Sequence, residues 1–238
     1  AQAAFCGFAE RFCRAGKEDI LHEPVCAGAV SGREALYQCL NGVGNGYFSA
    51  VWGKIFRTAS LRRADGTFLE MKQYAIAEDE LWLTALLPTL ETVVLLPQPF
   101  YNWRQREGSA IHAGRAFSNK WYSALDAKRE AAELLAGMPE FEDLRNAKIY
   151  ADLYHVLWQS WCYGTRQDYR YFRKELAAYQ KAFYRSKEFS RARKLKAVVM
   201  DIMIFLHLPK SWMETLGEST ALELKRKLRR KQHGTQEE

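Results

Sequence analysis

Three consecutive carboxylates, Glu78, Asp79 and Glu80, precede an apolar segment with helical spacing. Carboxylates in the first turn of a helix face unsatisfied backbone N–H groups, which keep them ionised and therefore able to accept a proton. Such a group can act as a general base that takes the proton of an attacking hydroxyl. The alternative is that the three acids only stabilise the helix start, by about 0.3–1 kcal/mol each. Spacing alone favours this second interpretation.

A second group of polar residues, Arg104, Arg106 and Ser109, follows an apolar strand some twenty residues later. The planar guanidinium of arginine matches the oxygens of a phosphate group, and Gly108 lets the backbone approach them closely. These residues could therefore stabilise the charge on a departing diphosphate. The alternative is an edge strand with solvated arginines.

The elements that must hold these residues can be predicted from periodicity, caps and breaks. We expect strands at 3–8 and 92–96, an extended edge at 100–104, a strand or short helix within 48–61 and a polar loop at 62–76. We expect helices from Ser31 to Leu40, at 78–87, and near 115–136, 140–163, 167–184, 190–207 and 219–231. Ser31 and Glu34 form a capping-box pattern.

The carboxylates, the arginine segment and the run Val51-Trp52-Gly53-Lys54-Ile55-Phe56-Arg57 resemble the C-terminal half of the catalytic domain in bacterial family 2 glycosyltransferases. These GT-A-fold enzymes transfer a sugar from a nucleotide diphosphate. The resemblance implies an α/β fold: the C-terminal part of a Rossmann-like GT-A domain over 1–110, followed by an α-helical region over 111–238. The nucleotide-binding half is not in the chain, so we expect a fragment that is inactive alone. We also expect its strand at 3–8 to lie at an exposed sheet edge.

The resemblance also assigns roles to residues. It implies that Asp79 is the catalytic base and Glu78 its neighbour near the acceptor, and that the turn carrying Arg104, Arg106 and Ser109 closes over the diphosphate. Glu107-Gly108 stand where processive synthases have Arg-Trp, which indicates a non-processive, inverting enzyme of bacterial cell-surface polysaccharide synthesis.

Trp52 and Lys54 correspond to a segment that borders the acceptor and donor pockets in this family. Gly53 replaces the usual asparagine, so a side-chain hydrogen bond from that position is lost. Trp52 could stack on a sugar ring or pack in the core.

The resemblance implies a divalent cation, Mg or Mn, in the full-length enzyme, held on an Asp-x-Asp motif. No Asp-x-Asp occurs in this chain, so the main ligands would lie outside it. His112, just past the Gly-Ser turn, is a candidate additional ligand, although a lone histidine is more often a packing or surface residue.

Charge is distributed unevenly along the chain. Residues 1–110 hold 11 Lys/Arg and 12 Asp/Glu, a net charge of −1, so residues 111–238 carry +8 of the charge that sums to +7. Leucines alternate with cations over 219–231, and this segment could lie on an anionic membrane or pack as a solvated terminal helix. The implied partners are a nucleotide-diphosphate sugar and a glycan or lipid-linked acceptor. The expected location is the cytoplasm, at the inner face of the membrane if the terminal segment binds there.

The five cysteines lack metal-binding or paired spacing, as expected for free thiols in a reducing cytosol. The alternative function is a non-enzymatic basic helical module that binds nucleic acid or an anionic membrane surface. Aromatic and cationic residues do alternate over 169–173. Asp168 and Glu175 reduce the charge there and no recognition motif is present, so nucleic acid is not the expected partner.

Overall fold

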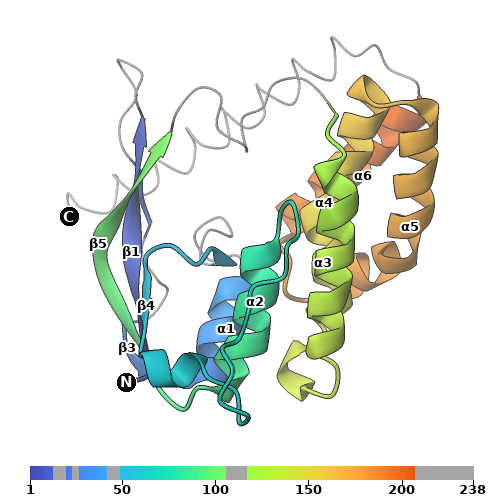
Figure 1. Cartoon of the computed structure of the whole chain (residues 1–238). Coiled ribbons are helices and arrows are strands. Elements are labelled where there is room, and N and C mark those ends of the chain that lie inside the picture. The colour runs from blue at the N-terminus through green and yellow to red at the C-terminus, as the bar shows by residue number, and fades with distance from the viewer. Residues whose placement is uncertain (13–19, 23–26, 42–48, 106–116, 207–238) are drawn as a thin grey trace, which may run out of the picture.

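The computed structural model describes residues 1–12, 20–22, 27–41, 49–105 and 117–206. Figure 1 shows a mixed β-sheet on one side, two helices against it, and a group of longer helices beyond them. The predicted α/β class is confirmed at this level.

The sheet is built on two long parallel strands, β1 (Ala3–Phe12) and β5 (Val93–Gln105). Three short strands pair antiparallel with them: β2 (Ile20–His22) and β4 (Lys54–Phe56) with β1, and β3 (Gly28–Val30) with β5. The prediction that the first strand lies at an exposed edge is wrong. β1 is central, because β4 and β2 pair along the side of β1 that faces away from β5.

Strand β5 runs through two prolines that were expected to interrupt it. The pairing with β1 shifts from Cys6–Leu96 to Phe8–Tyr101, so that residues 97–100 bulge out of the ladder. Proline has no N–H to donate, and a bulge is where a strand tolerates it. In a regular strand, residues 5 and 8 would point to opposite faces of the sheet. The shift in pairing lets the side chains of Phe5 and Phe8 both be buried.

Two helices pack next to the sheet, α1 (Gly32–Leu40) and α2 (Glu78–Leu86). The predicted cap of α1 is confirmed, because Ser31 Oγ accepts the Glu34 N–H at 3.1 Å. A Cβ on Gly32 would lie 1.9 Å from the Leu87 carbonyl oxygen, so only glycine fits where α1 meets the end of α2. Leu36, Leu40 and Leu83 are fully buried between these elements.

The remaining described helices are α3 (Lys120–Leu134), α4 (Arg145–Tyr163), α5 (Arg166–Arg185) and α6 (Arg191–Phe205), close to the four predicted ranges. Short 3₁₀ turns occur at Thr58–Leu61, Leu87–Thr89 and Pro139–Phe141. Thr165 and Asp168 form a complete capping box at the start of α5. The helix predicted at 219–231 lies outside the described residues.

Candidate functional site

The first turn of α2 holds Asp79 against the segment that precedes β4. Asp79 Oδ2 accepts the backbone N–H of Val51 at 3.1 Å. The other oxygen, Oδ1, has no hydrogen bond to any residue that the structure describes, and it is not buried. One carboxylate oxygen is therefore fixed and the other is open.

Strained backbone marks this helix start. Ala77, the residue before α2, has φ = 70°, the one positive φ of a non-glycine residue in the described ranges. A left-handed alanine costs about 1 kcal/mol, and such strain is concentrated at functional sites. No side chain caps the helix, so the first-turn N–H groups remain oriented toward the three acids.

Lys54 lies beside Asp79 at the beginning of β4. Its ammonium donates to the Ala50 carbonyl oxygen and lies 4.9 Å from the centre of the Phe5 ring. Burial lowers the pKa of Lys54, and the nearby Cys39 thiol and Asp79 carboxylate partly oppose that shift. The amino group of Lys54 is therefore already engaged within the fold.

Trp52 packs in an aromatic cluster on the sheet. Its ring stacks on Tyr101 and Trp103 at centroid distances of 4.7 and 5.8 Å and meets the edge of Phe8 at 4.9 Å. This geometry favours the packing interpretation of Trp52. The neighbouring Gly53 has φ = 71°, a backbone conformation that favours glycine.

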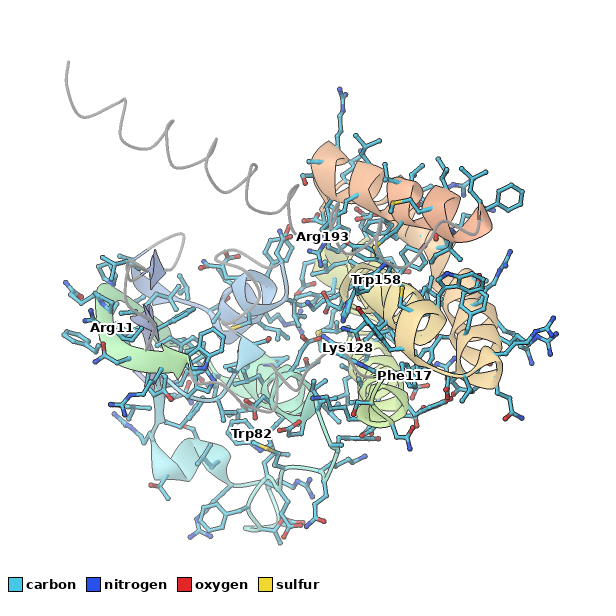
Figure 2. The ribbon with its side chains drawn as sticks, turned by 90° about the horizontal axis from the view of Figure 1, so that it is seen from above. Arg11, Trp82, Phe117, Lys128, Trp158 and Arg193 are labelled. Carbon is cyan, nitrogen blue, oxygen red and sulfur yellow. The ribbon has the colours of Figure 1, made fainter. Side chains whose placement is uncertain are left out.

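The structure does not bring Arg104 to this group. Arg104 is exposed and follows Trp103, whose side chain faces Trp52, so strand alternation turns Arg104 to the opposite face of the sheet. That face also carries Arg11, which donates to Asn102 Oδ1 at 2.9 Å and is labelled in Figure 2. The expected convergence of Asp79 and Arg104 is therefore not observed. Arg106, Ser109 and His112 lie outside the described residues.

The two acids beside Asp79 have different surroundings. Glu78 Oε2 is buried and has no hydrogen-bond partner among the described residues. Glu80 is 5% exposed and points into the interior. Sequence reasoning grouped Glu80 with the other two acids of the first turn and gave it no separate role. Helical spacing could have predicted that Glu80 is buried, because it lies three residues before Leu83 and seven before Leu87 on the buried stripe of α2.

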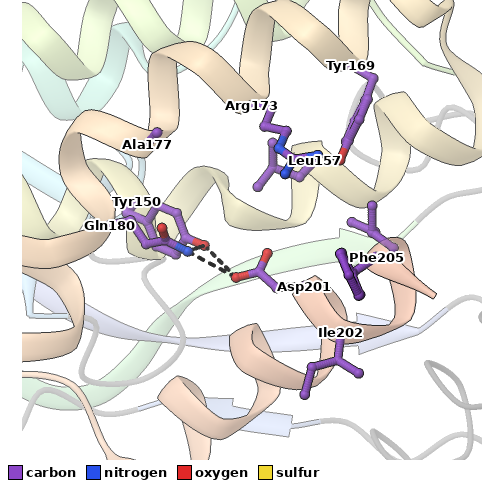
Figure 3. A pocket seen from close by; sticks show the side chains of 10 residues that line it. Tyr150, Leu157, Tyr169, Arg173, Ala177, Gln180, Asp201, Ile202 and Phe205 are labelled. Carbon is purple, nitrogen blue, oxygen red and sulfur yellow. Dashed lines mark hydrogen bonds between the residues drawn. The ribbon is translucent and has the colours of Figure 1, made fainter. Parts of the chain in front are cut away.

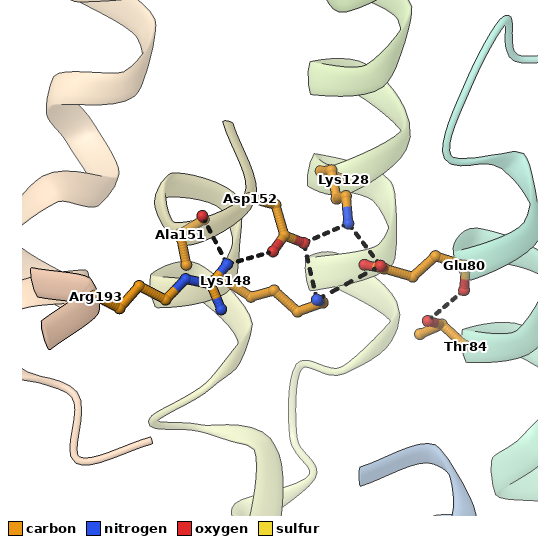
Figure 4. Close-up of polar contacts among 7 residues, drawn as sticks. All are labelled: Glu80, Thr84, Lys128, Lys148, Ala151, Asp152 and Arg193. Carbon is orange, nitrogen blue, oxygen red and sulfur yellow. Dashed lines mark hydrogen bonds and ion pairs between the residues drawn. The ribbon is translucent and has the colours of Figure 1, made fainter. Parts of the chain in front are cut away.

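Glu80 belongs to a buried ion network that joins α2 to the helical region (Figure 4). Lys128 Nζ lies 2.6 Å from both Glu80 Oε2 and Asp152 Oδ2, and Lys148 Nζ lies 2.8 Å from Asp152 Oδ2. Arg193 Nη2 donates to Asp152 Oδ1 at 3.2 Å. Burial disfavours ionised Asp152, but these three cations outweigh it and hold the pKa of Asp152 well below its usual range.

A second buried carboxylate lies among α4, α5 and α6 (Figure 3). Asp201 Oδ2 accepts from the Tyr150 hydroxyl at 3.2 Å and from Gln180 Nε2 at 3.1 Å, beside a pocket of about 490 Å³. Burial raises the pKa of Asp201, while these hydrogen bonds oppose the rise. Its oxygen is therefore engaged in holding helices together, and we assign it no chemistry.

Comparison with protein-family models, with curated proteins and with solved structures gives no significant match for this chain. Within the described ranges, no three His, Cys, Asp or Glu side chains gather as a metal site would require. The residues described here do not fit the implied divalent cation, and no step below is assigned to it. Among the described helices, none has both the length and the apolar character needed to cross a bilayer.

Proposed function

We propose that this chain is the acceptor-side part of a GT-A-type glycosyltransferase in which Asp79 is the general base. The observation that carries the proposal is the asymmetric setting of the Asp79 carboxylate. Val51 N–H fixes Oδ2 at 3.1 Å, while Oδ1 is open and has no partner in the described part of the chain. A base needs this combination of a fixed orientation and a free lone pair.

In the proposed reaction the oxygen of an acceptor hydroxyl attacks the anomeric carbon of the donor sugar. The bond from that carbon to the diphosphate breaks, the electron pair leaves with the diphosphate, and the hydroxyl proton passes to Asp79 Oδ1. Attack from the face opposite the leaving group inverts the anomeric configuration. We keep Glu78 as the neighbour of the base on the resemblance alone, because its Oε2 is enclosed by protein and does not face the acceptor.

We assign the binding of the donor diphosphate to residues outside this cluster. We propose Arg106 and Ser109 for the diphosphate on the resemblance alone. Arg104 has weaker support, because it lies on the other face of the sheet from Trp52. Lys54 has weaker support as a phosphate ligand, because its amino group is engaged by the Ala50 carbonyl oxygen.

An exposed apolar stripe on α6 supports peripheral contact with an anionic membrane, which suits a lipid-linked acceptor. Its members follow helical spacing and include Phe205 at 75% and Leu195 at 63% exposure; the full set is Leu195, Val198, Val199, Ile202, Phe205 and Leu206. The cation-rich segment 219–231 follows in the sequence. A leucine and phenylalanine face accompanied by many cations is typical of helices that lie on anionic bilayers.

The nucleic-acid alternative has less support from the structure. Phe172 is fully buried, Tyr171 packs on Tyr122, and the Arg173 guanidinium donates to the Tyr169 hydroxyl at 3.1 Å. The aromatic rings of this segment are thus engaged inside the helical region, whereas single-strand binding needs rings that are free to stack on bases.

The proposal is tested by Asp79→Asn in the full-length protein. Asparagine can still accept the Val51 N–H but has no proton affinity, so kcat should fall by about 10²–10⁴-fold with donor KM nearly unchanged. Glu78→Gln, one residue earlier, is the matched control and should lower kcat far less. Unchanged turnover in Asp79→Asn would refute Asp79 as the base.

A further inference from the structure

A pocket of about 470 Å³ opens where α2, α3, α4 and α6 meet. Its charged lining consists of Lys128, Lys148, Arg193 and Lys196 against Glu80 and Asp152. His155 also lines the pocket, but burial lowers its pKa to about 4, so it is neutral at pH 7. The pocket therefore has a formal excess of two positive charges.

The excess is located at the outer end of the pocket. The side chains of Glu80, Lys148 and Lys128 are 7%, 9% and 11% exposed, and these three groups compensate one another with Asp152. The side chain of Arg193 is 36% exposed, and Lys196 is exposed. Uncompensated cations in a concave site favour the binding of an anion.

The outer cations have donors that are not in use. Arg193 contacts Ala151 O at 2.8 Å and Asp152 Oδ1 at 3.2 Å through Nη2 alone. Its Nε and Nη1 make no hydrogen bond to the residues the structure describes, and Lys196 forms no ion pair with them. Arg193 and Lys196 are three residues apart on α6, so they lie on one face of the helix.

We propose that this pocket binds a phosphate group, held between the unused Nη1 of the Arg193 guanidinium and the Lys196 ammonium. Nη2 is held by Ala151 O and Asp152 Oδ1, so Arg193 would donate to a phosphate oxygen through Nη1 as a single charge-assisted hydrogen bond. The excess of two positive charges matches a phosphate monoester, whereas a carboxylate would neutralise only one of them. Trp121 and Ile76 line the same pocket and provide apolar surface for the sugar or polyol that carries the phosphate.

The position of the pocket indicates which substrate would carry the phosphate. Ala77 and Glu80 line it on either side of Asp79 in the sequence, and Ser49 lines it two residues before the Val51 that holds Asp79. A phosphate bound there lies on the acceptor side of the proposed base. The assignment to the acceptor rests on the proposed function; the binding of phosphate does not.

The test is calorimetric titration of residues 1–238 with glucose 1-phosphate at constant ionic strength. We expect measurable binding that Lys196→Gln weakens about tenfold, the effect of losing one charge-assisted contact. Arg193→Lys keeps the charge but loses a guanidinium that can contact Ala151 O and Asp152 through one nitrogen and phosphate through another, so it should weaken binding several-fold. Arg191→Gln is the matched control, because Arg191 is an exposed cation on the same helix that does not line the pocket. It should leave the Kd within about twofold.

Several outcomes decide the proposal. Equal losses of glucose 1-phosphate affinity in Lys196→Gln and Arg191→Gln would overturn it, and so would no binding at all. It would also be overturned if glucuronate bound as tightly as glucose 1-phosphate. A different outcome is binding to vesicles that contain phosphatidic acid, with loss of that binding in Lys196→Gln and no competition by glucose 1-phosphate. It would support the phosphate site and assign the phosphate to a lipid headgroup. Phosphate binding that persists in a full-length protein without transferase activity would leave the pocket standing while the proposed function fails.

Discussion

Two adjacent carboxylates on α2 should respond very differently to the same change of charge. Glu80 Oε2 lies 2.6 Å from Lys128 Nζ and 3.6 Å from Lys148 Nζ, and the Glu80 side chain is 7% exposed. Removing one partner of a buried ion pair costs about 3–5 kcal/mol. Glu80→Gln keeps an acceptor for Lys128, so we expect a loss of about 2–3 kcal/mol in the free energy of unfolding.

Asp79→Asn is the matched control, one residue earlier in the same helical turn. The introduced amide can still accept the Val51 N–H, and the loss is limited to the attraction of the charge to the helix N-terminus and to Lys54. That loss should be about 1 kcal/mol.

Urea unfolding of residues 1–238, followed by circular dichroism, measures both variants. With a slope of about 2–3 kcal/mol per M, Glu80→Gln should lower the midpoint by about 1 M. Its Tm should fall by about 5–10 °C. Adding Lys128→Met to Glu80→Gln should cost less than the sum of the single changes, because the two side chains share one contact. Small, equal shifts in Glu80→Gln and Asp79→Asn would show that the network does not stabilise the fold.

Three other perturbations test separate parts of the structure. The pKa of His155 is about 4 in the folded chain and 6.5 in the unfolded chain, so the unfolded chain takes up the proton first and stability should fall as pH drops from about 6.5 to 4. In unfolding measured at a series of pH values, His155→Phe should remove up to about 3 kcal/mol of that pH dependence. The raised pKa of Asp201 means that its charged form opposes folding, so Asp201→Asn should keep or raise Tm at pH 7, and a clear drop would contradict this. Co-sedimentation with phosphatidylserine vesicles should be lost in Ile202→Ser/Phe205→Ser and kept in Leu134→Ser, a control with an exposed leucine on α3.

The sequence predicted elements more reliably than partners. The helix at Ser31 and the four later helices were found because caps, glycine breaks and apolar spacing are local signals. Strand β1 was placed at an edge, because pairing with β2 and β4 depends on chain segments that no local pattern connects. The prolines of β5 were read as an interruption, since a bulge is visible only once the partner strand is known.

The candidate site divides in the same way. The acids at the start of α2 could be identified from sequence, because a first helical turn and its charges are contiguous. Their separate surroundings could not, because Val51 lies 28 residues from Asp79 and Lys128 lies 48 residues from Glu80. Arg104 was expected to serve the same site as Asp79, but the face to which it points depends on the register of β5 against β1.

Helix α2 contacts both the sheet side of the molecule and the helical region, because successive residues of a helix point in different directions. Each residue turns by about 100° around a helix axis, so Asp79 faces the segment before β4 while Glu80 faces α3 and α4. Lys72 and Tyr74, in the loop before α2, both contact Glu130 of α3 and extend the same contact surface. The ion network therefore limits how α2 can move relative to the helical region. Asp79 shares the first turn of α2 with Glu80, so the residues that fix Glu80 also fix the proposed base. A substrate held at Arg193 and Lys196 would then be positioned against the same turn.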